Sequence, residues 1–245
     1  MISLKRFFVV MNFVAAVAAS LVVAGCKKQL TVTGTTTLPA LEGRMMSLRV
    51  YSDGEMTVVD SARVIHGRFS FDVPVDSAVM ASLFLGDESV LPVVLDGSPV
   101  EIAITENEHR VTGSALNDTL YSFIRRKSVL DEQLAELPRR ESQMILEGMD
   151  HDSILAQLNS EAAVLSAQND ALVTSFIKDH MDDVLGPGVF MIATSRLPYP
   201  YMTPQIEELI TLASDAFKND AYVRDWVRMA RENAEKINEE QGLAE

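Results

Sequence analysis

The spacing of apolar residues changes near residue 115, and this change limits the possible folds more than any other feature of the sequence. Before it, apolar and polar residues alternate in short runs such as Arg68–Val73, as they do along half-buried strands. After it, apolar residues recur every three or four positions, as they do on one face of a helix. The sequence therefore predicts an α+β, multidomain fold, with a β domain over 29–114 and a helical domain over 115–241.

The β domain is predicted to be an antiparallel β-sandwich or barrel of seven or eight short strands. The runs 79–85 and 90–95 are almost continuously apolar, so both are expected to be buried on two faces. Turn pairs such as Asp53-Gly54 separate the runs. The candidate strands are 31–33, 47–51, 56–64, 68–73, 79–85, 90–95, 100–104 and 109–112.

Two apolar seams in the helical domain predict an antiparallel helical hairpin with its connection at 148–152. Each seam contains one polar residue, Lys127 in the first and Asn169 in the second. Asn169 either fixes the register from a buried position or reaches solvent at the edge of the seam. The seams consist of Leu116, Leu120, Phe123, Lys127, Leu130, Leu134 and Leu137, and of Leu158, Ala162, Leu165, Asn169, Leu172 and Phe176.

Further helices complete a predicted small helical bundle. Pro138 is expected to break or kink the first helix, and Leu185–Gly188 is expected to mark a break before a short helix over 189–193. Thr203-Pro204 is typical of a helix start, with an N-cap followed by proline at the first helical position. Two later apolar faces consist of Ile206, Leu209, Ile210, Ala213 and Phe217, and of Val223, Trp226, Val227, Ala230 and Ile237.

The first 25 residues have the order of a secretory signal peptide. Lys5 and Arg6 precede a long apolar run, and Leu21–Cys26 resembles the bacterial lipobox, in which the cysteine becomes the lipid-modified first residue. Cys26 is the only cysteine of the chain, which excludes an intramolecular disulfide and a cysteine-based zinc site. We expect cleavage before Cys26, a lipid-anchored segment over 26–28, and lasting membrane attachment through the acyl chains. The alternative is an uncleaved transmembrane helix, since about 20 apolar residues span a bilayer.

The residue after Cys26 and the overall charge bear on location and partners. The segment after Cys26 resembles lipoprotein sorting signals in having Lys27 rather than the aspartate that commonly retains lipoproteins in the inner membrane. No acidic export cluster follows, so the resemblance implies the outer membrane, facing the periplasm. With 21 Lys and Arg against 35 Asp and Glu, the net charge is −14, which argues against a nucleic-acid partner. The expected partners are the membrane, through lipid on Cys26, and an envelope protein.

Several motifs resemble an uncharacterised β domain of Gram-negative, Bacteroides-type envelope lipoproteins. Asp60–Val64 and His66–Phe71 match its pattern of D-S-x-x-V followed by x-G-x-F-x-F. Val93–Gly97 also fits, and Gly113–Asn117 matches the G-S-x-x-N exit of that family. The resemblance covers about residues 29–120 and implies a β domain of unknown function followed by helices.

Many relatives of that kind continue into a thioredoxin-like domain with a Cys-x-x-Cys centre. This chain stops near Gly242, about where that domain would begin, so we expect the domain to be missing. Disulfide exchange requires an attacking thiolate, and no cysteine remains once Cys26 is acylated. The redox chemistry of those relatives is therefore not expected here.

Candidate catalytic and metal-binding residues are few. His180 with Asp182 and Asp183 is the nearest approach to a metal cluster, but two potential ligands on one helix face are too few for a structural metal. We expect a solvated helix end there and no metal. Three histidines are expected in exposed turns or loops: His66, His109 and His151.

The sequence contains no G-x-S-x-G elbow, P-loop, H-E-x-x-H or D-x-D-x-D-G motif. Glu207-Glu208 and Glu239-Glu240 are interpreted as solvated helix surface. Tyr199 and Tyr201, which lie between prolines, either contact a glycan or peptide or pack against the bundle.

These observations predict a non-enzymatic, lipid-anchored envelope protein for binding or scaffolding, without a cofactor. One alternative is an accessory protein of periplasmic thiol-disulfide or peroxide-reducing systems, without redox chemistry of its own. A second alternative is an unrecognised hydrolase with a polar site between the two domains.

Overall fold

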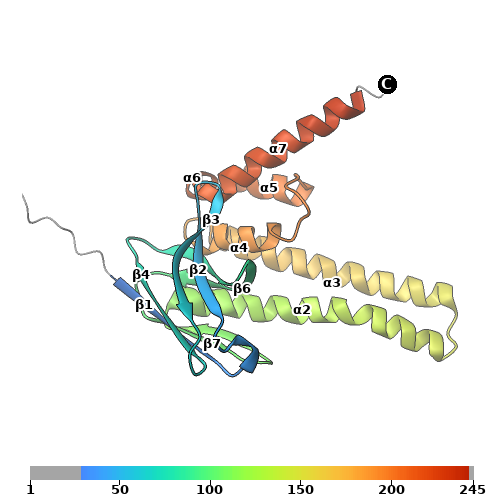
Figure 1. Cartoon of the computed structure of the whole chain (residues 1–245). Helices are drawn as coiled ribbons and strands as arrows, with labels where there is room; N and C mark the ends of the chain where they lie inside the picture. The colour runs from blue at the N-terminus through green and yellow to red at the C-terminus, as the bar shows by residue number, and fades with distance from the viewer. Residues whose placement is uncertain (1–28, 243–245) are drawn as a thin grey trace, which may run out of the picture.

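The structure, a computed structural model, describes residues 29–242. The predictions made for the signal peptide, for Cys26 and for residues 27–28 lie outside this range. The described chain forms an N-terminal β domain and a C-terminal helical part (Figure 1), which confirms the predicted α+β fold.

Eight strands form two four-stranded sheets. Sheet A has the order β4-β1-β7-β8 and sheet B the order β3-β2-β5-β6. All neighbouring strands are antiparallel except β1 and β7, which run parallel with Val32 opposite Val100. The strands are β1 (Gln29–Thr36), β2 (Met45–Ser52), β3 (Glu55–Arg63), β4 (Arg68–Pro74), β5 (Val79–Leu85), β6 (Glu88–Leu95), β7 (Val100–Ile104) and β8 (His109–Thr112), with a 3₁₀ turn η1 (Pro39–Leu41) after β1.

The two sheets bury different numbers of faces. In β1 and β4 of sheet A, buried and exposed residues alternate, so this sheet has one face in the core and one in solvent. In β5 of sheet B the five consecutive residues Met80–Phe84 are buried, which confirms the two-sided burial predicted for 79–85. In β6 such consecutive burial is confined to Val93–Leu95.

The helical part begins with a hairpin of two long antiparallel helices, α2 and α3, as predicted (Figure 1). Its turn, over residues 147–150, lies slightly before the predicted connection. Within residues 29–242 no helix is long and apolar enough to cross a membrane. The helices are α2 (Ala115–Leu146), α3 (His151–Asp179), α4 (Leu185–Thr194), α5 (Pro204–Leu212), α6 (Asp215–Asn219) and α7 (Ala221–Gly242).

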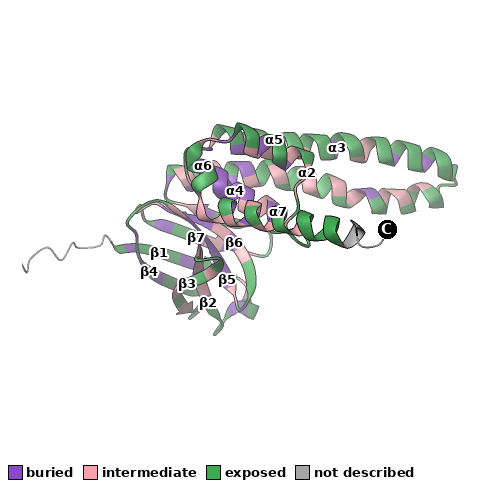
Figure 2. Ribbon diagram, turned by 90° about the horizontal axis from the view of Figure 1, so that it is seen from above, coloured by how far each residue is buried: buried purple, intermediate pink, exposed green. Residues whose placement is uncertain are grey.

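Helix α4 lies against the second face of sheet B and is the most thoroughly buried helix (Figure 2). Gly188 in its first turn contacts Met80 of β5, and a Cβ atom added at Gly188 would lie 2.1 Å from the Met80 Cε atom. A larger residue at this position would push the helix away from the sheet, because real Cβ atoms do not approach other atoms so closely.

The predicted break at Leu185–Gly188 is wrong, because these four residues are the buried first turn of α4. The break lies earlier, over His180–Val184. Proline is tolerated in the first turn of a helix, since the N–H groups there have no partner within the helix. The two glycines of this segment allow close packing rather than ending the helix.

One hydrophobic core joins the strands to the helices. Phe71 of sheet A, Leu83 of sheet B, Phe190 of α4 and Trp226 of α7 belong to the same buried cluster. A separate small cluster holds the outer part of the hairpin together, formed by Leu137, Ile154, Leu158 and Leu165. This outer part, residues 130–165, extends beyond the main core (Figures 1 and 2), and we call it the arm.

Helix α2 continues through Pro138 to Leu146, so the chain does not leave the helix at this proline. Pro138 is exposed, and the residue before it, Leu137, packs in the core of the arm. The proline ring therefore faces solvent, where the carbonyl group that loses its helical hydrogen bond can be hydrated. Packing on the opposite face keeps the helix continuous.

Candidate functional site

The first two turns of α2 protect the outer edge of sheet B. Val94 of β6 donates its N–H to the Asn117 Oδ1 atom, and Asn117 Nδ2 donates to the Val94 carbonyl, both at 2.8 Å. The Tyr121 hydroxyl donates to the Pro92 carbonyl at 3.0 Å, and burial raises the pKa of Tyr121. These side chains occupy backbone groups that an edge strand otherwise offers to another chain.

Two of the motifs noted in the sequence meet at this edge. Ser114 caps α2 by accepting the Asn117 N–H at 3.2 Å, and its hydroxyl also accepts the Asn117 side-chain amide at 3.0 Å. The G-S-x-x-N motif thus aims its asparagine at the second valine of the V-V-L-D-G motif. The role of these motifs is structural.

The histidines do not converge on a common site. His66 lies in the β3–β4 turn with a φ of 52°, as expected, and its N–H donates to Glu42 at 2.9 Å. The backbone hydrogen bonds from His66 and Gly67 lower the pKa of the Glu42 carboxyl. The other two predicted surface histidines are also exposed, but they begin regular elements: His109 starts β8 and His151 starts α3.

His180 and Asp183 form a helix-terminating contact. The His180 Nδ1 atom and the Asp183 Oδ2 atom lie 2.7 Å apart, and Asp183 Oδ1 accepts the Leu185 N–H at 2.7 Å. This carboxylate thus closes the turn between α3 and α4, while Asp182 is exposed. Residues 29–242 contain no group of three or more side chains suited to hold a metal ion.

The two tyrosines between prolines are exposed, and their ring centroids lie 5.6 Å apart. Their loop is attached to α7, because Asn233 donates to the Pro200 carbonyl at 2.9 Å. The rings of Tyr199 and Tyr201 therefore contact each other and leave part of their surface open to solvent. The carboxylate pair predicted at the helix surface in α5 is exposed as expected, and Glu208 accepts from Lys178 at 2.8 Å.

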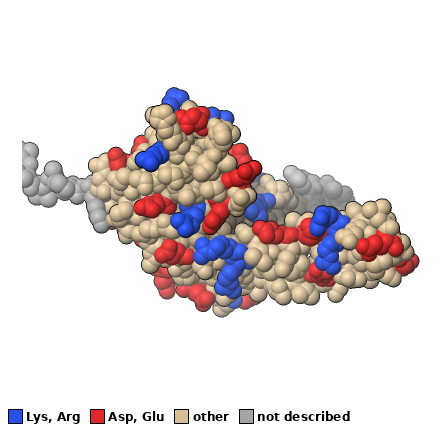
Figure 3. All heavy atoms as spheres, turned by 90° about the horizontal axis from the view of Figure 1, so that it is seen from below, with Lys and Arg blue, Asp and Glu red and all other residues tan. Residues whose placement is uncertain are grey.

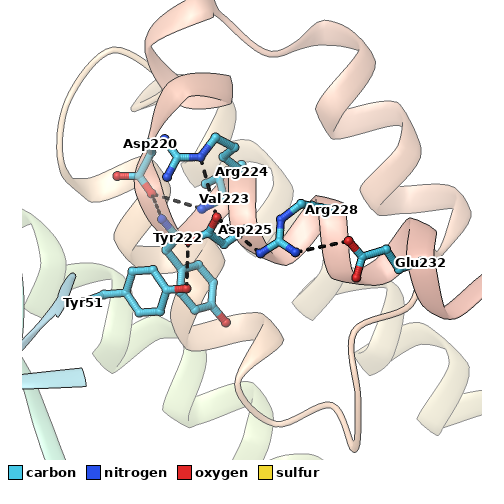
Figure 4. Close-up of polar contacts among 8 residues, drawn as sticks. All are labelled: Tyr51, Asp220, Tyr222, Val223, Arg224, Asp225, Arg228 and Glu232. Atoms are coloured by element: carbon cyan, nitrogen blue, oxygen red, sulfur yellow. Dashed lines mark hydrogen bonds and ion pairs between the residues drawn. The ribbon is translucent and has the colours of Figure 1, made fainter. Parts of the chain in front are cut away.

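Helix α7 is fixed to the β domain by a polar contact at Tyr51 of β2 (Figure 4). The Tyr51 hydroxyl donates to the Asp225 Oδ2 atom at 3.2 Å, and its ring meets the ring of Tyr222 edge-on. Burial and the Asp225 carboxylate raise the pKa of Tyr51 to about 12. Arg224 and Arg228 lie 3.6 and 3.7 Å from the same carboxylate, so this contact is a small charged network. It contains no converging set of nucleophile and base.

The two polar seam residues of the hairpin meet at one carboxylate. Lys127 donates to both oxygens of Asp131, at 2.7 and 2.8 Å, and Asn169 Nδ2 donates to Asp131 Oδ1 at 3.0 Å. Asn169 therefore links the two helices and does not simply reach solvent. The Arg196 guanidinium lies 3.7 Å from Asp131 and is mostly exposed. Neither Asp131 nor Arg196 was predicted as a site residue, since neither stands on a seam.

A cavity of about 250 Å³ adjoins this cluster. We call it the root pocket, because it lies where the hairpin joins α4 and α5. Its floor is apolar, with Ile177, Phe190 and Leu209 almost fully buried. Its polar lining includes Lys127, Asn169, Asp170, Arg196, Thr203 and Gln205.

The far end of the arm exposes apolar side chains. We call residues 141–155 the tip. Leu146 at the end of α2 is 88% exposed, and Ile145, Met149 and Leu155 are exposed as well. The tip contains four carboxylates and no lysine or arginine: Glu141, Glu147, Asp150 and Asp152. On the face of the molecule shown in Figure 3, by contrast, acidic and basic side chains are interspersed over the body and along the hairpin.

Comparison with known proteins assigns one part of the chain to a family. Residues 30–120 match DUF4369, a domain of unknown function. The match ends in α2 and includes Asn117, so the edge-protecting turn belongs to the same unit as the strands. No curated protein and no solved structure matches the chain. The chain thus contains a DUF4369 domain over residues 30–120, and this domain shares its core with helices that continue beyond the match.

Proposed function

We propose that this protein is a lipid-anchored, non-enzymatic binding module of the cell envelope, whose arm presents the tip to a partner protein. The observation that carries the proposal is the exposed apolar tip at the end of a helix of 32 residues, about 48 Å long. Contiguous apolar groups exposed at such a place commonly mark an interaction surface.

The start of β1 and the tip lie at opposite ends of the described chain. β1 begins at one end and the hairpin turn lies at the other in both ribbon views (Figures 1 and 2). Only three residue steps separate Cys26 from Gln29, which is at most about 11 Å of chain. Acylation of Cys26 would hold the β domain close to the bilayer and leave the tip on the far side.

The charge of the tip favours a protein over a lipid surface as its partner. Four carboxylates without a balancing cation would be repelled by anionic lipid headgroups. They would complement an apolar groove with a rim of lysine or arginine on another envelope protein. The alternative, an accessory role in thiol-disulfide or peroxide-reducing systems, is supported only by the family resemblance.

Photo-crosslinking in intact cells tests this proposal. A photoreactive amino acid replaces Leu146 at the tip, and in a control variant it replaces Asn159, which is exposed on the side of the arm. We expect a discrete protein adduct from position 146 only, and its loss when Ile145→Ser and Met149→Ser are added. Adducts to lipid, equal adducts from both positions, or no protein adduct at all would contradict the proposal.

A further inference from the structure

The root pocket has hydrogen-bonding capacity that the described protein leaves unused. The Arg196 guanidinium forms only the long ion pair to Asp131, and none of its five N–H groups makes a hydrogen bond within residues 29–242. Asn169 Oδ1 is a buried acceptor, and no group in the described part of the chain donates a hydrogen bond to it. Buried polar atoms without partners are rare in folded proteins, so each calls for a specific explanation.

These two groups lie around the same carboxylate. Asn169 Nδ2 is 3.0 Å from Asp131 Oδ1, and Arg196 Nη1 is 3.7 Å from Asp131 Oδ2. Asp131 is already paired with Lys127, so its charge is largely compensated within the cluster. Asp170 adds a carboxylate to the lining but forms no ion pair with either cation. A ligand bound here would accept hydrogen bonds from Arg196 and donate one to Asn169.

The apolar lining and the volume of the pocket indicate which further groups the ligand carries. Ile177, Phe190 and Leu209 form an almost fully buried apolar base. Above it, the partly buried residues Val173, Ile192 and Leu197 line the pocket and leave apolar surface open to a ligand. A cavity of about 250 Å³ has room for one apolar side chain and the groups attached to it, and not for a large cofactor.

We propose that the root pocket binds an N-acylated apolar amino acid, the chemistry that the carboxyl-terminal residue of a peptide also presents. The carboxylate pairs with Arg196 at the rim, the amide N–H donates to Asn169 Oδ1, and the apolar side chain fills the floor. Arg196 is 73% exposed and can move aside to admit the ligand. This inference does not depend on the tip, because the pocket lies at the other end of the hairpin.

The chain contains a natural reporter for this site. Trp226 is its only tryptophan, and the Trp226 ring meets the ring of Phe190 edge-on with the centroids 5.3 Å apart. Phe190 also lines the pocket. A ligand on the pocket floor should therefore change the tryptophan fluorescence, and calorimetry gives an independent dissociation constant.

The test titrates the protein with N-acetyl-L-leucine, with its amide N-acetyl-L-leucinamide, and with octanoate, which has a carboxylate and an apolar chain but no N–H. We expect N-acetyl-L-leucine to bind at least about tenfold more tightly than either of the other two, since each of them lacks one charge-assisted or buried hydrogen bond. A pentapeptide that ends in leucine shows whether the natural ligand is the end of a peptide or a free N-acylated amino acid. Tighter binding of the pentapeptide than of N-acetyl-L-leucine identifies a peptide end, and weaker binding identifies the small molecule.

Two variants assign the contacts. Arg196→Gln should weaken binding of N-acetyl-L-leucine about tenfold, while the control Arg139→Gln, at an equally exposed arginine of the arm, should leave it unchanged. Asn169→Leu should abolish the preference for N-acetyl-L-leucine over octanoate. Equal binding of the acid and its amide, insensitivity to Arg196→Gln, or no binding at millimolar concentrations would overturn the inference. Each of these results would leave the crosslinking test of the tip unaffected.

Discussion

Asn117 pairs with the backbone of Val94 as a neighbouring strand would, through one accepted and one donated hydrogen bond of 2.8 Å each. Both residues are fully buried. Asn117 lies in the first turn of helix α2, and Val94 lies in the edge strand β6. This contact joins the end of the β domain to the beginning of the hairpin. The family match extends past the last strand into α2 and includes both residues.

Asn117→Ala should lower the free energy of unfolding by about 2–4 kcal/mol, because it leaves the buried N–H and C=O of Val94 without partners. Urea denaturation measures this change, and the dependence on urea should stay as in the wild type. The control Asn159→Ala, on the exposed side of α3, should change stability by less than about 0.5 kcal/mol. A loss as small as that of the control would show that the pairing does not stabilise the edge.

Gly188→Ala should lower stability by about 1–3 kcal/mol, because the new methyl group would overlap with the Met80 side chain. Met80→Ala creates space at the same place, so the double variant should be more stable than the sum of the two single effects predicts. Thermal or urea unfolding of the wild type, the two single variants and the double variant gives the coupling energy between residues 80 and 188. Strict additivity would mean that α4 does not pack on β5 at this glycine.

The Tyr51–Asp225 contact predicts a loss of stability at high pH. Because burial and Asp225 raise the pKa of Tyr51 to about 12, the folded chain holds this proton at pH values where the unfolded chain releases it. The contribution is complete below pH 10 and is lost as the pH rises toward 12. Tyr51→Phe should remove one late step from the tyrosinate absorbance titration, and Asp225→Asn should move that step to lower pH. An unchanged titration in both variants would contradict the contact.

Pro138→Ala should stabilise the protein by about 1–2 kcal/mol, because it restores a hydrogen bond inside a helix that is already continuous. The gain should be concentrated in the arm, which has its own small core. Hydrogen exchange resolved by segment measures it: amides of residues 130–165 should exchange more slowly, while those of the β domain keep their rates. Slower exchange throughout the chain would show instead that the arm and the body unfold together.

Much of the fold follows from local patterns in the sequence. Alternation of apolar and polar residues predicted strands such as β4, a continuous apolar run predicted the covered strand β5, and the two seams predicted the hairpin. The Thr203-Pro204 start of α5 is confirmed, with Thr203 accepting the Ile206 N–H at 3.2 Å. Such features depend on residues a few positions apart, which the sequence shows directly.

The features that were missed depend on contacts between distant residues. Gly188 is an apparent helix breaker in the sequence, and only its contact with Met80, more than 100 positions earlier, explains its place in a buried helix. Lys127 and Asn169 stood out as polar seam residues, but their common partner Asp131 lies off the seam. Arg196 gave no signal, because a lone exposed arginine in a loop is ordinary until a pocket is seen beside it.

Mass spectrometry of the N-terminal peptide, prepared from the native envelope, tests the central claim most directly. The proposal of an anchored envelope module predicts that the mature chain begins at Cys26 and that this residue carries acyl chains. A peptide that retains Met1, or one that begins at Cys26 with an unmodified thiol, would contradict it.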